Sequence, residues 1–152
     1  MPTALEVQTT GFVLASDVRW ATTTAERAQG LIGRERLAFG QALILTPAKQ
    51  VHTYGMTYPI DVVFCDAKWT VKHVRRRMRP RRMTRVVIGS RYAIELPGGA
   101  VPTNLRRGDA LTISRCSGRS GGRHLVDARE KGLVGKEEPE PGRLSQALAQ
   151  ES

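Results

Sequence analysis

Seven short runs rich in apolar residues, separated by glycine, proline and charged residues, constrain the fold of this chain most strongly. They cover residues 12–15, 42–45, 60–65, 69–74, 85–88, 93–96 and 111–114. Runs this short fit β-strands better than core helices. Turn-forming residues lie at 97–99, directly after the run 93–96, and at 108–109, just before the run 111–114. The pattern predicts a mainly β fold of the α+β class, a small compact barrel-like sheet with one short helix.

The helix is predicted between residues 22 and 30. Thr23 and Glu26 form a capping box, in which each side chain satisfies a backbone donor of the first turn. Gly30 suits the left-handed conformation that ends many helices. Because a helix this short needs tertiary packing to be stable, Leu31 and Ile32 are expected to supply the contact.

The composition changes at residue 117. Residues 117–122 are mostly small and polar, and residues 137–142 combine glutamate with proline. Such stretches bury too little apolar surface to offset the entropy lost on ordering. The sequence therefore predicts one folded domain over residues 1–116 and a disordered polar tail over residues 117–152.

No apolar stretch approaches the roughly 20 residues needed to span a bilayer. No basic residue precedes Arg19, and Glu6 and Asp17 interrupt the apolar residues, which argues against a signal peptide. We therefore expect a cytoplasmic protein with Cys65 and Cys116 reduced. Cys65 lies in an apolar run and is expected to be buried. Two distant thiols without a CxxC pair predict no metal site, and no cofactor motif is present.

The positive charge is concentrated in one segment. The interval between Asp66 and Glu95 contains no acidic residue and ten of the 24 basic residues, which leaves 14 basic and 14 acidic residues elsewhere. The net charge of +10 therefore belongs to this segment. A solvated basic hairpin or loop is the favoured interpretation. Pro80 would interrupt a helix in this segment. Base stacking needs aromatic rings between the arginines, and only Trp69 and Tyr92, which flank them, are aromatic.

The alternative for this segment is weak binding of nucleic acid or another anionic surface, since guanidinium groups pair well with phosphate. Such binding would be independent of base sequence and would weaken steeply with salt. The candidates for the contact are Lys72, Arg75, Arg76, Arg77, Arg79, Arg81, Arg82 and Arg85.

The densest group of chemically capable residues lies in segment 50–61. His52 titrates near neutral pH, Gly55 permits a positive φ, and Asp61 could accept a hydrogen bond from His52. One histidine and one acid without a nucleophile fall short of a catalytic triad or a metal site. The residues by themselves favour a polar network that fixes an irregular loop, with a small binding or catalytic pocket as the alternative.

Glu95 is a single acid between apolar neighbours. The favoured placement is on the solvent side of a strand. The alternative is an inward carboxylate that pairs with an arginine such as Arg27 or Arg34.

Three stretches taken together resemble a known family. Residues 24–34 are similar to its first motif, residues 52–64 to its second and most specific motif, and residues 95–99 with 108–109 to its third. The family is DUF192, also called UPF0127, of bacteria and archaea. The resemblance spans about residues 22–113. It implies a compact β-rich domain with a short helix, and it implies no particular reaction.

We therefore predict a non-enzymatic binding module for an unidentified small ligand or peptide. The clustering of polar residues and special backbone positions in loops 50–61 and 95–99 motivates this hypothesis. The alternatives are binding of nucleic acid or an anionic surface through residues 72–91 and, least supported, an enzyme that uses His52 as acid or base. The ligand-binding candidates are His52, Thr53, Gly55, Met56, Asp61, Glu95 and Pro97.

Overall fold

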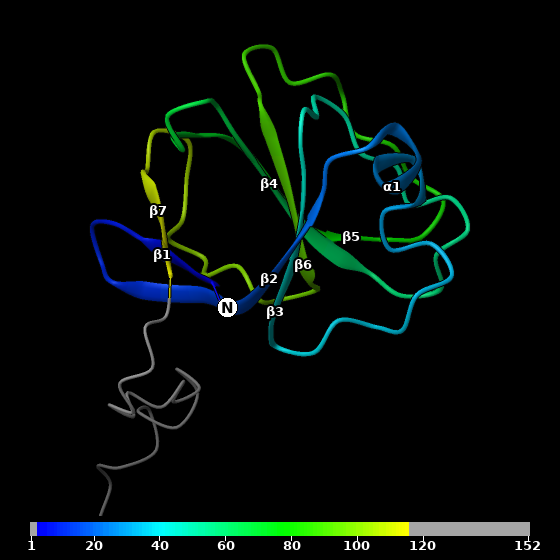
Figure 1. Cartoon of the computed structure of the whole chain (residues 1–152), viewed down its shortest axis with the longest axis horizontal. Coiled ribbons are helices and arrows are strands. Elements are labelled where there is room, and N and C mark those ends of the chain that lie inside the picture. Colours follow the sequence, from blue (N-terminus) through cyan, green and yellow to red (C-terminus); the bar gives the residue numbers. More distant parts are fainter. Residues whose placement is uncertain (1–2, 116–152) are drawn as a thin grey trace, which may run out of the picture. The chain divides into compact units, whose positions relative to one another are not determined.

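The computed structural model describes residues 3–115, so Cys116 and the predicted tail over residues 117–152 lie outside the described part. The described residues form one seven-stranded sheet and one helix, which confirms the predicted mainly β fold (Figure 1). The strands are β1 (Thr3–Val7), β2 (Phe12–Ala21), β3 (Gly40–Leu45), β4 (Ile60–Cys65), β5 (Val71–Met78), β6 (Tyr92–Pro97) and β7 (Leu111–Arg115), and the helix is α1 (Thr24–Gln29).

The sheet curls into a half-barrel. Its strand order is β5-β4-β6-β3-β2-β1-β7, and all neighbours are antiparallel except β2 and β3, whose connection contains α1. The two edge strands approach each other through a bridge between Thr70 and Ala110. Beside it, the Val71 N–H donates to the Asp109 carbonyl at 2.8 Å. Part of each exposed edge is therefore covered by the other.

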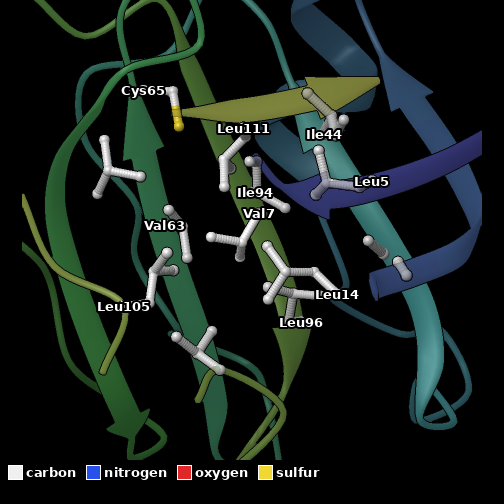
Figure 2. Close-up of a cluster of buried hydrophobic side chains, with 14 residues drawn as sticks. Leu5, Val7, Leu14, Ile44, Val63, Cys65, Ile94, Leu96, Leu105 and Leu111 are labelled. Carbon is white, nitrogen blue, oxygen red and sulfur yellow. The ribbon is translucent and has the colours of Figure 1, made fainter. Parts of the chain in front are cut away.

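Aliphatic side chains fill the inner face of the curled sheet. Figure 2 shows Leu5, Val7, Leu14 and Ile44 pointing into the same space as side chains from β4 and β6. Cys65 is fully buried in this inner cluster, as predicted. Burial raises the pKa of its thiol to about 12, so the sulfur remains a neutral, unreactive thiol near neutral pH.

A second, outer cluster covers the opposite face of β3, β4 and β6. It contains Leu31, Val51 and Met56 from the segments that follow α1 and β3, packed on strand residues such as Phe64. β4 is buried at every position, and apart from Asp61 all of its residues are apolar, as suits a strand covered on both faces. This outer layer is the part of the fold that positions the candidate site.

The N-terminal end of α1 has the predicted capping box. The Thr23 hydroxyl accepts the Glu26 N–H at 3.2 Å, while the Glu26 carboxylate accepts the Thr23 N–H at 2.9 Å. The hydrogen bonds from the backbone of Thr23 and Thr22 hold the pKa of Glu26 below its usual value. Gly30 ends the helix with a positive φ of 49°. Within residues 3–115, no helix has the length and apolar character needed to cross a bilayer.

Four of the strand assignments differ clearly from the structure. β5 covers Val71–Met78 and not residues 69–74, so the sheet includes part of the arginine-rich segment. β1 was not predicted, and β2 continues six residues beyond the predicted end at Ala15. The strand predicted at residues 85–88 is wrong, because this segment is a loop in which Val86 is 57 % and Ile88 is 90 % exposed. Its apolar residues suggested a paired strand, but none of residues 85–88 pairs with a strand in the described part of the chain.

Candidate functional site

The three motif stretches meet at a small pocket beside the end of α1. The pocket has a volume of about 40 Å³. Arg27, Gly30 and Leu31 come from the first stretch, His52 and Met56 from the second, and Glu95 from the third. Segments more than 60 residues apart in the sequence therefore contribute to one wall.

Glu95 lies in this pocket and is only 2 % exposed, so the favoured solvent-facing placement was wrong. Along β6, Ile94 and Leu96 belong to the inner cluster and Ala93 to the outer one. Alternation therefore directs Glu95 toward the outer layer, which α1 and its following loop cover. A Cβ on Gly30 would lie 3.4 Å from Glu95 Oε2, so this glycine leaves the carboxyl room.

The Glu95 carboxyl is buried without a compensating charge in contact. Its Oε2 atom has no hydrogen-bond partner among residues 3–115, and no ion pair joins it to Arg27 or Arg34 in the same range. Burial raises its pKa to about 8, an effect that the charge of Arg34 partly opposes. At neutral pH the group is therefore a neutral acid that can both donate and accept a hydrogen bond.

Tyr58 was not selected from the sequence, yet it carries a second buried polar atom without a partner in the described range. Burial raises the pKa of its phenol, and the charge of an ionised Glu95 raises it further, so the two groups are close enough to interact. The Arg36 guanidinium lies 5.7 Å from the Tyr58 ring centroid and opposes the shift. Only the tertiary structure reveals this pair, since the residues are far apart in sequence.

Asp61 does not pair with His52, contrary to the suggested hydrogen bond. Its carboxyl accepts the Arg77 N–H at 2.7 Å and the Val101 N–H at 2.9 Å, and the side chain is fully buried. Ile60 and Val62 belong to the outer cluster, so the side chain between them points to the opposite face. Asp61 therefore joins β5 to the loop after β6, and it does not line the pocket.

The other candidates from the second and third stretches also shape the loops. The buried Thr53 hydroxyl donates to the Arg79 carbonyl at 2.7 Å and accepts the Arg82 N–H at 3.0 Å. Gly55 has a φ of 83°, and a Cβ there would lie 3.2 Å from Ile32 Cγ2. Pro97 is buried at the end of β6. Of the seven predicted residues, His52, Met56 and Glu95 line the pocket.

Two of the eight basic candidates are already engaged within the protein. Lys72 forms an ion pair with Asp66 at 3.4 Å. The Arg76 guanidinium donates to the Leu105 carbonyl at 2.6 Å and the Pro102 carbonyl at 2.8 Å, so it supports the loop before β7. The remaining six are exposed, and none forms an ion pair within the described part: Arg75, Arg77, Arg79, Arg81, Arg82 and Arg85.

Ligands for a metal ion do not gather anywhere in the described residues. No group of three or more His, Cys, Asp or Glu side chains is placed there to hold one. The pocket itself offers hydrogen bonding by the neutral Glu95 carboxyl, with His52 exposed beside it.

Gly98 brings the second and third stretches into backbone contact. A Cβ on it would lie 2.9 Å from the Pro59 carbonyl oxygen, and its φ is not in the left-handed region. We therefore expect Gly98→Ala to lower the free energy of unfolding by about 2 kcal/mol, because the Pro59 backbone must move. Urea denaturation measures the change. A variant as stable as the wild type would show that the contact is relaxed at no cost.

Comparisons with known proteins place the same residues in one family. Residues 5–113 match the model of the DUF192 family, described as "Uncharacterized ACR". No curated protein matches the sequence.

Two solved structures share the fold. A protein of unknown function from Novosphingobium aromaticivorans DSM 12444 is 20 % identical, with a TM-score of 0.63 over 74 % of this chain and 84 % of that one. A protein from Sinorhizobium meliloti 1021, described as "a putative transcription regulator", is also 20 % identical, with a TM-score of 0.60 over 73 % of this chain and 91 % of that one. At this identity the similarity shows the fold alone.

Proposed function

The chain belongs to the DUF192 family, as its motifs predicted, and on that premise we propose that it is a binding module for a small polar ligand or a peptide. The pocket beside α1 is the proposed site. One observation carries the proposal: Glu95 is 2 % exposed and its Oε2 atom has no partner among residues 3–115. A buried polar group without a partner is destabilising, and a ligand that supplies the missing hydrogen bond removes that cost.

The chemistry of the pocket selects the group it would bind. A volume of about 40 Å³ admits only a few atoms, so the rest of the ligand would lie outside, near His52 and Gln50. A neutral carboxyl is complementary to a primary amide, which offers both a donor and an acceptor. An ammonium group is disfavoured, because Arg27 lines the same pocket. Binding is favoured over catalysis, since His52 lacks Asp61 as a partner.

An NMR titration with acetamide, acetate and methylammonium tests the proposal. Acetamide is expected to shift the amide signals of Gly30, Met56 and Glu95 saturably, with a Kd on the order of millimolar, as suits a fragment of four heavy atoms. Ala28→Leu, at an exposed helical position that lines the pocket, is expected to abolish the shifts.

Ala25→Leu is the matched control, because Ala25 is exposed on the same helix and does not line the pocket. It is expected to bind acetamide as the wild type does. Unmoved signals with all three probes, or equal binding by Ala28→Leu, would contradict the proposal. A preference for methylammonium would show that the carboxyl binds as an anion.

A second candidate function is binding of a polyanionic surface. Six exposed arginines without an ion pair in the described range favour it. The description of the Sinorhizobium protein as a putative transcription regulator is compatible with a nucleic-acid partner. The candidate would use residues 72–91 and is independent of the Glu95 pocket.

A further inference from the structure

We propose that the loop over residues 79–91, called here the basic loop, docks on an anionic lipid bilayer. Val86 and Ile88 would enter the interface while the arginines contact the headgroups. The inference rests on the second candidate function and chooses between its two possible partners. It does not depend on the Glu95 pocket.

The first observation is apolar exposure. Ile88 is 90 % exposed, and Met83 and Val86 are 58 % and 57 % exposed. A single exposed apolar side chain is ordinary in soluble proteins. Here three such side chains lie within six residues of one loop, in a segment without any acidic residue. The exposure of this clustered apolar surface to water is unfavourable.

The second observation is the way in which the loop is held. The Val87 N–H donates to the Lys49 carbonyl at 2.8 Å, and Val87 packs against the outer cluster. The Ser90 hydroxyl donates to the Ala48 carbonyl at 2.8 Å. Because Val87 is fixed inward, its neighbours Val86 and Ile88 remain on the outside. The apolar tip is therefore presented by the fold.

The third observation is the charge around this tip. Arg85 and Arg107 line the same surface hollow as Val86 and Ile88, together with Lys72, whose charge is paired with Asp66. Burial lowers the pKa of His73, which also lines the hollow, and the charges of Arg85 and Arg75 lower it further. The aliphatic tip thus lies in a positive field.

These observations favour lipid over nucleic acid. Proteins that bind single strands stack bases on aromatic rings, and the basic loop contains none. Exposed aliphatic side chains gain nothing from phosphates. Basic residues around aliphatic ones are, however, the combination that holds peripheral proteins at anionic membranes.

Vesicle co-sedimentation with the full chain tests the inference. The wild type is expected to bind vesicles of 70 % phosphatidylcholine and 30 % phosphatidylserine, and to bind pure phosphatidylcholine weakly. The double variant Val86→Ser/Ile88→Ser is expected to lose about tenfold in affinity for the anionic vesicles, because two apolar side chains no longer leave water. A parallel titration with a 20-base-pair DNA duplex should be unaffected by the same variant.

Phe39→Ser is the matched control, since Phe39 is 72 % exposed but precedes β3, far from the basic loop in sequence. It is expected to leave vesicle binding unchanged. Arg75→Ser/Arg85→Ser should weaken vesicle binding several-fold through charge alone. The inference is overturned if Val86→Ser/Ile88→Ser binds anionic vesicles like the wild type, or if the wild type binds the duplex and no vesicle. Acetamide binding is expected to be the same in these variants as in the wild type, so the two proposals can fail separately.

Discussion

Replacing Glu95 with glutamine is expected to raise the thermal midpoint at pH 8.5 by on the order of 10–20 °C and to change it little at pH 5. Glutamine keeps the shape of the side chain and removes its ionisation. The effect is large because the carboxyl is 2 % exposed and has no ion pair within the described residues. Burial raises its pKa to about 8.

The direction follows from proton binding by the two states. The carboxyl ionises near its ordinary value of 4.5 in the unfolded chain and near 8 in the folded one. Between these values the folded protein binds more protons, so its stability falls as the pH rises. Below pH 4.5 the free energy of unfolding contains the full contribution of the neutral carboxyl. About 4 kcal/mol of this contribution is lost by pH 8.5.

Thermal melts of the wild type and Glu95→Gln between pH 5 and pH 9 measure the effect. Glu35→Gln is the control, because it removes the same charge at an exposed position. It is expected to melt parallel to the wild type across the range. If Glu95→Gln also stays parallel to the wild type, the pKa of the carboxyl is not raised by folding and the neutral-acid chemistry proposed for the pocket is wrong.

The sequence predicted correctly those helices and strands whose formation depends on residues close together in the chain. The helix begins at Thr24 because Thr23 and Glu26 satisfy each other's backbone donors. The run 60–65 forms β4 because a short, mostly apolar sequence with the β-branched residues Ile60, Val62 and Val63 suits a strand buried on both faces. In both cases the chemistry that selects the structure lies within a few residues.

Strands that depend on distant partners could not be predicted in this way. β1 is stabilised by pairing with β2 on one side and β7 on the other, and its short sequence carries no local signal. The segment 85–88 has the opposite property: its composition fits a strand, yet it does not pair. Pairing is a property of the whole sheet, so composition alone cannot assign it.

The sequence led to the expectation that the motif stretches meet, but it did not give the orientation of the Glu95 side chain. The motif stretches do converge, and His52, Met56 and Glu95 line one pocket. The alternation of side chains along β6 places Glu95 and Leu96 on opposite faces of the sheet. It does not tell which of the two faces other parts of the chain cover. The loop after α1 covers the outer face, and alternation between Ile60 and Val62 turns Asp61 on β4 away from it.

Replacing Asp61 with alanine is expected to lower the free energy of unfolding by about 3 kcal/mol. The substitution removes the acceptors of two backbone N–H groups, those of Arg77 and Val101. The Val101 bond is buried, so water cannot replace the carboxyl there. Arg77 also has a φ of 47° opposite an irregular pairing of β4 with β5, a conformation that its bond to Asp61 supports. Urea denaturation measures the loss.

Asp66→Ala provides the matched comparison. Asp66 Oδ1 also accepts two backbone N–H groups, from Lys68 and Thr70, but its side chain is 22 % exposed and water can take its place. Asp66→Ala is expected to lower the free energy of unfolding by only about 1 kcal/mol. Equal decreases for Asp61→Ala and Asp66→Ala would contradict the role assigned to burial. Asp61→Asn keeps one acceptor oxygen and should be intermediate. Because Asp61 lies on the inner face, Asp61→Asn is expected to bind acetamide as the wild type does. If the folded Asp61→Asn variant lost acetamide binding, Asp61 would be part of the binding site.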